Sequence, residues 1–167
     1  MQRLPLTKNH YLILKGPNMH KLLLPPITWL FSIAAMLLAH EIVPILHIEP
    51  SFWRTAIGII LLLGAIALTV WHKQLFQRTK TNIDTFGQPD HLVESGLFRY
   101  IRNPMYLGFV VSLAALALVM GALSPWLLVL GFFMLAHLWY IPFEEQAMQN
   151  KFGEQYAAYQ ARTRRWI

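Results

Sequence analysis

The stretch FVVSLAALALVMGALSPWLLVLGFFMLAHLWYIPF, residues Phe109–Phe143, contains no Asp, Glu, Lys or Arg. It is long enough to cross the hydrocarbon core of a bilayer twice, because one helical crossing needs about 17 to 25 residues. The turn-forming run Gly121–Pro125 interrupts it, and so short a connection makes the two helices antiparallel neighbours. The stretch therefore predicts a transmembrane helix hairpin with crossings at about 105–123 and 126–143.

The rest of the chain is also unusually apolar. Only 13% of its 167 residues are charged, against roughly 25% in soluble domains. Further apolar runs at about 22–46 and 52–72 predict two more crossings, and Pro25 and Pro26 suit the first turn of a helix. We therefore expect a single all-α polytopic membrane domain over residues 1–167, with about four transmembrane helices and an interfacial N-terminal segment at 1–21.

The basic residues are distributed asymmetrically along this pattern. Of the 14 Lys and Arg residues, only Arg54 lies between the first and second crossings, and none lies between the third and fourth. The other 13 fall where the positive-inside bias places cytoplasmic segments, which predicts that both termini are cytoplasmic. The basic excess is thus a topology signal. Nucleic-acid binding is not expected, since no basic helix face or stacking platform accompanies the charge.

Two polar clusters flank the hairpin at its predicted cytoplasmic mouth. One is the cassette HLVESGLFRYIRNPMYLG, residues His91–Gly108, and the other is the pair Glu144 and Glu145. Carboxylates accept hydrogen bonds from ammonium or hydroxyl groups, arginine donates in a fork to a carboxylate, and tyrosine faces meet flat rings or cations. The clusters therefore predict a site for a charged ligand with a flat ring. S-adenosylmethionine has these groups, and so do other nucleotides.

Two blocks of the sequence resemble a known superfamily. Residues Leu92–Gly108, and the run from Glu144 to Tyr159, are similar to the signature of the isoprenylcysteine carboxyl methyltransferase and phospholipid methyltransferase superfamily. The resemblance covers about residues 72–167. It implies an integral membrane enzyme, of the bacterial inner membrane, that binds S-adenosylmethionine on the cytoplasmic side and methylates a lipophilic acceptor arriving from the bilayer.

The resemblance also implies roles for particular residues and segments. It makes 73–104 the cytoplasmic cofactor-binding segment, 105–143 the helix hairpin, and 144–167 a cytoplasmic helix, broken at Gly153, with a basic tail. It points to Glu144, Glu145 and Arg102 as catalytic residues. The residues expected to hold the cofactor are His91, Leu92, Val93, Gly96, Tyr100, Asn103, Pro104, Tyr106, Leu107 and Gly108, and those expected to face the acceptor are Tyr159 and Arg162. Independently of the resemblance, the polar His137 within the fourth predicted crossing is expected either to line the pocket toward the acceptor or to form an interhelical hydrogen bond.

One position departs from the superfamily pattern, which commonly has Arg-His-Pro where this chain has Arg102-Asn103-Pro104. Asparagine can form hydrogen bonds but cannot shuttle a proton near neutral pH. Any acid–base role of a histidine there is therefore not available to Asn103.

The acceptor is open among a carboxylate, an amine and a thiol. Methyl esterification of a prenylated cysteine carboxylate is the leading prediction, and N-methylation of a phospholipid is the alternative within the class. An amine or thiol would need a base, for which we expect Glu144 or Glu145 to serve. A membrane reductase using NADPH and a non-enzymatic membrane scaffold are the alternatives from other classes. The chain has no cysteine, and no metal site is expected, since Pro44 interrupts the helix carrying His40 before His47.

Overall fold

A computed structural model describes residues 24–43, 45–49, 51–79 and 91–167. The predicted interfacial segment 1–21 lies outside these residues. Over the described ranges the chain is helical, with no β-strand, so the all-α prediction is confirmed. The α-helices are α3 (Pro25–Ile42), α4 (Phe52–Thr79), α5 (Pro104–Met120), α6 (Ser124–Leu135), α7 (Ile141–Phe152) and α8 (Glu154–Arg162), with a 3₁₀ turn η1 (Gly96–Arg99) and a π-helical segment η2 (Ala136–Tyr140).

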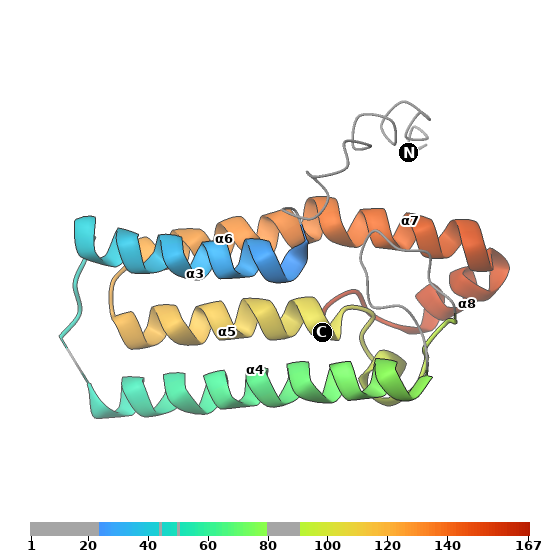
Figure 1. Cartoon of the computed structure of the whole chain (residues 1–167), viewed down its shortest axis with the longest axis horizontal. Helices are drawn as coiled ribbons and strands as arrows, with labels where there is room; N and C mark the ends of the chain where they lie inside the picture. Colours follow the sequence, from blue (N-terminus) through green and yellow to red (C-terminus); the bar gives the residue numbers. More distant parts are fainter. Residues whose placement is uncertain (1–23, 44, 50, 80–90) are drawn as a thin grey trace.

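Helices α3, α4, α5 and α6 run along the bundle in alternating directions (Figure 1). Helix α4 packs along α5, α3 packs along α6, and α5 contacts α3, α4 and α6. Helices α7 and α8, the cassette and the C-terminus all lie at one end of this bundle. The two polar clusters are therefore brought to the same end.

Proline and glycine set the ends of the hairpin helices. Pro104 and Pro125 occupy the first turns of α5 and α6, where a missing N–H removes no helical hydrogen bond. Gly121 ends α5 in the left-handed conformation, with φ of 66°. A Cβ there would lie 2.5 Å from the Arg54 guanidinium, so the turn needs glycine for both its backbone and its packing. The predicted short hairpin is confirmed.

Within the part of the chain that the structure describes, three helices are long and apolar enough to cross a membrane: Pro25–Ile42, Phe52–Trp71 and Ser124–Phe152. Helix α5 is apolar but has 17 residues, at the lower limit for a crossing. Large apolar side chains such as Phe31, Ile60 and Leu130 are exposed on α3, α4 and α6, as expected of surfaces that face lipid. The chain is a helical membrane protein, and the count of four crossings stays a prediction.

The helix of the fourth predicted crossing continues past Phe143. Segments α6, η2 and α7 form one unbroken helical run from Ser124 to Phe152. Pro142 lies within it, where its ring would crowd the carbonyl of Leu138 in a regular α-helix, and the wider π-helical segment just before it makes room. Glu144 and Glu145 consequently lie within this continuous helical run rather than at the end of a helix.

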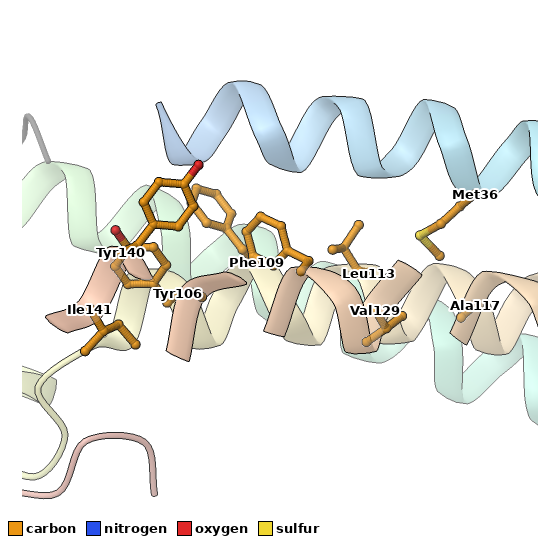
Figure 2. Close-up of a cluster of buried hydrophobic side chains, with 10 residues drawn as sticks. Met36, Tyr106, Phe109, Leu113, Ala117, Val129, Tyr140 and Ile141 are labelled. Carbon is orange, nitrogen blue, oxygen red and sulfur yellow. The ribbon is translucent and has the colours of Figure 1, made fainter. Parts of the chain in front are cut away.

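The core lies between α3, α5 and the α6–η2 run (Figure 2). Phe109 stacks on Trp29 at 5.5 Å between ring centroids, and the Trp29 indole donates a hydrogen bond of 2.8 Å to Ser112. Tyr106 and Tyr140 stack at 5.9 Å at the polar end of this core. Both rings are almost completely buried, and they form the floor of the candidate site.

Candidate active site

The first predicted contact across the mouth joins α5 to α7. The Tyr106 hydroxyl donates a hydrogen bond of 2.7 Å to Oε1 of Glu144. Tyr106 is 1% exposed, and its ring is held by Tyr140, whose hydroxyl lies 3.0 Å from that of Thr28 on α3. Glu144 is therefore oriented by a buried aromatic pair supported by three helices.

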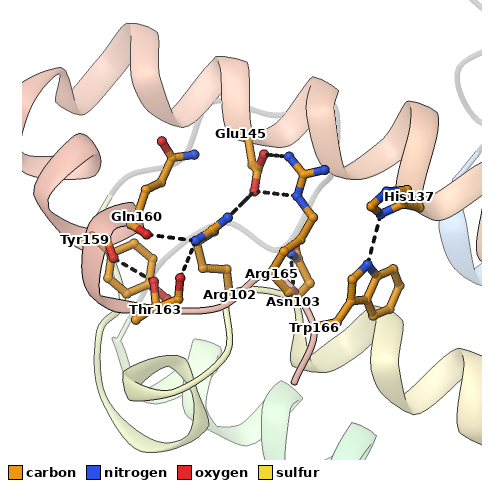
Figure 3. A network of polar contacts seen from close by, with 9 residues as sticks. All are labelled: Arg102, Asn103, His137, Glu145, Tyr159, Gln160, Thr163, Arg165 and Trp166. Carbon is orange, nitrogen blue, oxygen red and sulfur yellow. Dashed lines mark hydrogen bonds and ion pairs between the residues drawn. The ribbon is translucent and has the colours of Figure 1, made fainter.

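Glu145 faces a different set of partners (Figure 3). Arg102 donates to Oε1 of Glu145 from Nε at 3.2 Å and from Nη2 at 3.1 Å. Arg165 donates to Oε1 from Nε at 3.2 Å and to Oε2 from Nη2. The Arg102 and Glu145 side chains are only 12% and 11% exposed, so a largely buried carboxylate lies between two guanidinium groups.

The chain's C-terminal end completes this arrangement. Nη1 of Arg102 donates to the carbonyls of Gln160 and Thr163, and the side-chain amide of Asn103 donates to the carbonyl of Arg165 at 2.9 Å. The backbones of Ile101 and Arg164 form an isolated parallel bridge. Arg102 is thus held by α7, α8 and the tail, and Asn103 is held by the tail.

Helix α8 supports the cassette with two buried tyrosines. Tyr159 donates to the carbonyl of Phe98 at 2.7 Å, and Tyr156 packs beside it at 6.0 Å between ring centroids. Burial raises the pKa of Tyr159 to about 12. Burial, and then the negative charge of Glu145, raise the pKa of Tyr156. Both hydroxyls are therefore neutral over the physiological range, and that of Tyr159 serves as a hydrogen-bond donor.

The predicted acceptor-facing residues have partners of their own. Arg162 forms an ion pair of 2.5 Å with Glu94, and its side chain is 60% exposed, at the surface of the cassette. His137 lies in the π-helical segment and accepts a hydrogen bond at Nδ1 from the Trp166 indole at 3.1 Å. This bond links the helix to the C-terminal tail.

The two cassette glycines are explained by packing against α4. A Cβ on Gly108 would lie 3.3 Å from Oγ1 of Thr69, and one on Gly96 would lie 2.5 Å from the Trp71 ring. Gly96 also has φ of 63°, which favours glycine. At both glycines, which were expected to hold the cofactor, the groups that approach closely belong to α4 of the same chain.

The other predicted cofactor residues line the cassette with different degrees of exposure. Pro104 is buried at the start of α5, and Leu107 is half-buried one turn further. Leu92 and Val93 are half-buried, and His91 is exposed. Tyr100 is 66% exposed, and its carbonyl accepts the backbone N–H of Arg164.

Sequence reasoning missed Thr163, Arg165 and Trp166 as parts of this site. They follow α8 in a basic tail whose charge was interpreted only as a topology signal. No spacing or motif marks a segment that returns to a distant loop through backbone carbonyls. A largely buried acidic pair, which needs positive partners, was the one available signal.

The assembled groups can bind a ligand with charges of both signs. Glu144 presents a carboxylate held by a neutral phenol, while Arg102 and Arg165 together exceed the charge of Glu145 by one. Among the described residues there is no group of three His, Cys, Asp or Glu side chains placed to hold a metal ion. The site's own chemistry is thus binding and orientation by carboxylates, guanidinium groups and tyrosines.

Comparison with known proteins places this chain among membrane methyltransferases. No solved structure matches it. An uncharacterized protein of Haemophilus influenzae is 35% identical over 63 residues, which are 38% of this chain and the whole of that protein. The model of the phospholipid methyltransferase family matches residues 53–155, more than half of the chain and both polar clusters. The chain therefore belongs to the phospholipid methyltransferase family.

Proposed function

We propose that this protein transfers a methyl group from S-adenosylmethionine to a lipophilic acceptor at the end of the bundle where α5 meets α7, facing the cytoplasm. The observation that carries the proposal is the convergence of Tyr106 with Glu144, and of Arg102 with Glu145, in a chain of a membrane methyltransferase family. The predicted hairpin is what brings these groups together. The cytoplasmic orientation rests on the positions of the basic residues.

The residues present fit S-adenosylmethionine by their chemistry. Glu144 would accept from its ammonium group or ribose hydroxyls, Arg102 would donate to its carboxylate, and the exposed Tyr100 ring would offer an aromatic face. When bound, the cofactor supplies the methyl group on a sulfonium. The protein's own task is to hold donor and acceptor in line, an effect that contributes about 7–11 kcal/mol.

An acceptor that is already anionic, such as the carboxylate of a prenylated cysteine, fits this site best. It needs no base, whereas an amine or thiol must lose a proton. Both oxygens of Glu145 already accept from Arg102 and Arg165, and Oε1 of Glu144 accepts from Tyr106. An acceptor proton would therefore compete with two guanidinium groups at Glu145 and with the Tyr106 hydroxyl at Oε1 of Glu144.

A second candidate acceptor is the amine of an ethanolamine phospholipid. The description of the matched family as phospholipid methyltransferase favours it. In that reaction Glu144 is the base we would assign, because it is bonded to a neutral phenol whereas Glu145 lies between two cations. The two acceptors therefore make different demands on Glu144.

The proposal is tested by incubating the purified protein, in lipid nanodiscs, with S-adenosylmethionine carrying an isotopically labelled methyl group. Separate reactions contain a prenylcysteine analogue and phosphatidylethanolamine, and mass spectrometry identifies the labelled product. Labelled ester, lost in Arg102→Lys and retained in the exposed control Arg99→Lys, is the expected result. Labelled amine in place of ester would assign the phospholipid acceptor. No labelled product from these or from total membrane lipid would overturn the proposed methyl transfer.

A further inference from the structure

The last residues of the chain form a strap across the site. We call Thr163–Trp166 the C-terminal strap. Its carbonyls at Thr163 and Arg165 accept hydrogen bonds from the side chains of Arg102 and Asn103, and its backbone is bridged to Ile101 at Arg164. Through Arg165 it also supplies the second guanidinium on Glu145.

Trp166 anchors the far end of the strap. Its indole donates to Nδ1 of His137 at 3.1 Å, and its ring lies 5.0 Å from that of Phe133. His137 and Phe133 stack on each other at 5.7 Å, nearly parallel, so Trp166 meets a rigid aromatic surface on the α6–η2 run. Figure 3 shows this anchor next to the Arg165–Glu145 pair.

We propose that Trp166 is a positioning residue that holds Arg165, and through it Glu145 and Asn103, in the geometry that the methyl donor requires. The proposal rests on the proposed function, because the donor is S-adenosylmethionine. Trp166 follows Arg165 directly in the chain, so fixing its indole on His137 removes the torsional freedom that would let the Arg165 guanidinium leave Glu145. Ile167, the next residue, is 79% exposed and takes no part.

The binding of S-adenosylmethionine, measured by calorimetry, tests the proposal. Trp166→Ala should weaken binding about tenfold, corresponding to about 1.4 kcal/mol, with an unchanged midpoint of thermal unfolding. Trp166→Phe keeps a ring against Phe133 but removes the donor to His137. Its affinity for S-adenosylmethionine should lie between those of Trp166→Ala and the unsubstituted protein. Arg165→Ala should weaken binding at least as much as Trp166→Ala. Arg164→Ala is the matched control: it removes the same charge from an exposed side chain of the strap and should have no effect.

A kinetic comparison separates positioning from general destabilisation. Trp166→Ala should raise KM for S-adenosylmethionine by about the same factor as the dissociation constant, with a smaller change in kcat. Unchanged affinity in Trp166→Ala would overturn the proposal. So would a loss of affinity that is matched by Arg164→Ala or that tracks a lowered unfolding midpoint.

A second measurement does not depend on the cofactor. The chain has no cysteine, so Ile167→Cys carries a single spin label at the end of the strap. Trp166→Ala and His137→Phe should each increase the mobility of the label in its electron paramagnetic resonance spectrum, and combining them should add little further. If the unsubstituted protein binds no S-adenosylmethionine, the proposed function fails. The anchoring role of Trp166 is then decided by this spectrum alone, and an immobile label in Trp166→Ala would overturn it.

Discussion

Glu144 and Glu145 are adjacent in sequence, yet their carboxylates are held by different elements: Glu144 by Tyr106 of α5, and Glu145 by Arg102 of the cassette and Arg165 of the strap. Successive residues on a helix point about 100° apart, which allows one short segment to serve both partners. The two carboxylates therefore have different partners, and we expect separable roles for them, with Glu144 facing the ligand and Glu145 holding the surrounding residues in place.

Removing the two charges separately should show this difference. Glu145→Gln leaves two guanidinium groups without their counter-ion, and breaking a buried ion pair costs about 3–5 kcal/mol. Glu144→Gln keeps an acceptor for the Tyr106 hydroxyl and should cost less than about 1 kcal/mol. Chemical denaturation in detergent measures both, and both variants should lose turnover strongly. Near-normal turnover of a folded Glu145→Gln protein would remove Glu145 from the site.

Tyr106→Phe tests how Glu144 is oriented. The change deletes one hydroxyl from a buried ring and should leave the fold intact, since the stacking on Tyr140 remains. A hydrogen bond to a charged group contributes about 1.5–3 kcal/mol, so the affinity for S-adenosylmethionine should fall by about tenfold or more. The control is Tyr140→Phe, which deletes the hydroxyl beside Thr28 from the stacked ring and should bind close to normally. Equal affinities of the two variants would contradict the role given to Tyr106.

Stability should fall at alkaline pH because of the α8 tyrosines. The pKa of Tyr159 is raised from its ordinary 10.0 to about 12, and that of Tyr156 is raised as well. Above pH 10 the unfolded chain loses these protons while the folded chain keeps them, so the free energy of unfolding decreases as pH rises toward 12. Unfolding midpoints measured from pH 8 to 11 should show this decline. Tyr159→Phe should be less stable at pH 8 and should decline less steeply, and an identical slope would refute the assignment.

Gly121 provides a test of the hairpin far from the site. Alanine there must adopt the left-handed conformation, at a cost of roughly 1–2 kcal/mol, and must displace the Arg54 guanidinium. Gly121→Ala should therefore lower the thermal midpoint by several degrees. Gly131→Ala is the matched control, because a Cβ on Gly131 meets no other atom and the residue lies inside α6. A neutral Gly121→Ala would mean that the turn differs from the one described.

The parts of the fold that the sequence predicted are those fixed by local chemistry. A charge-free stretch with one turn predicts the hairpin, and the hairpin in turn places Tyr106 beside Glu144. The break at Gly153 was likewise readable, because glycine there has φ of 51° between α7 and α8. The continuation of the fourth helix beyond Phe143 was not, because Pro142 ordinarily ends a helix and only the π-helical segment accommodates it.

The contacts that escaped prediction are tertiary and use the backbone. The carbonyls of Gln160, Thr163 and Arg165 are acceptors that every residue type has, so no side-chain pattern announces them. The two cassette glycines show the same limit of prediction from sequence. Gly96 and Gly108 were expected to hold the cofactor, and nothing in the sequence indicated that Trp71 and Thr69 of α4 would pack against them.

We propose that the site formed by Tyr106, Arg102, Glu144 and Glu145 binds S-adenosylmethionine. A competition titration of the purified protein measures this binding directly. We expect saturable binding of S-adenosylmethionine that NADPH does not displace, and that is weakened by about tenfold or more in Glu144→Gln and Tyr106→Phe but kept in the exposed control Glu154→Gln. Preferential binding of NADPH would point to a reductase, and binding of neither ligand would point to a non-enzymatic membrane protein. Either result would contradict the binding of S-adenosylmethionine as a methyl donor at this site.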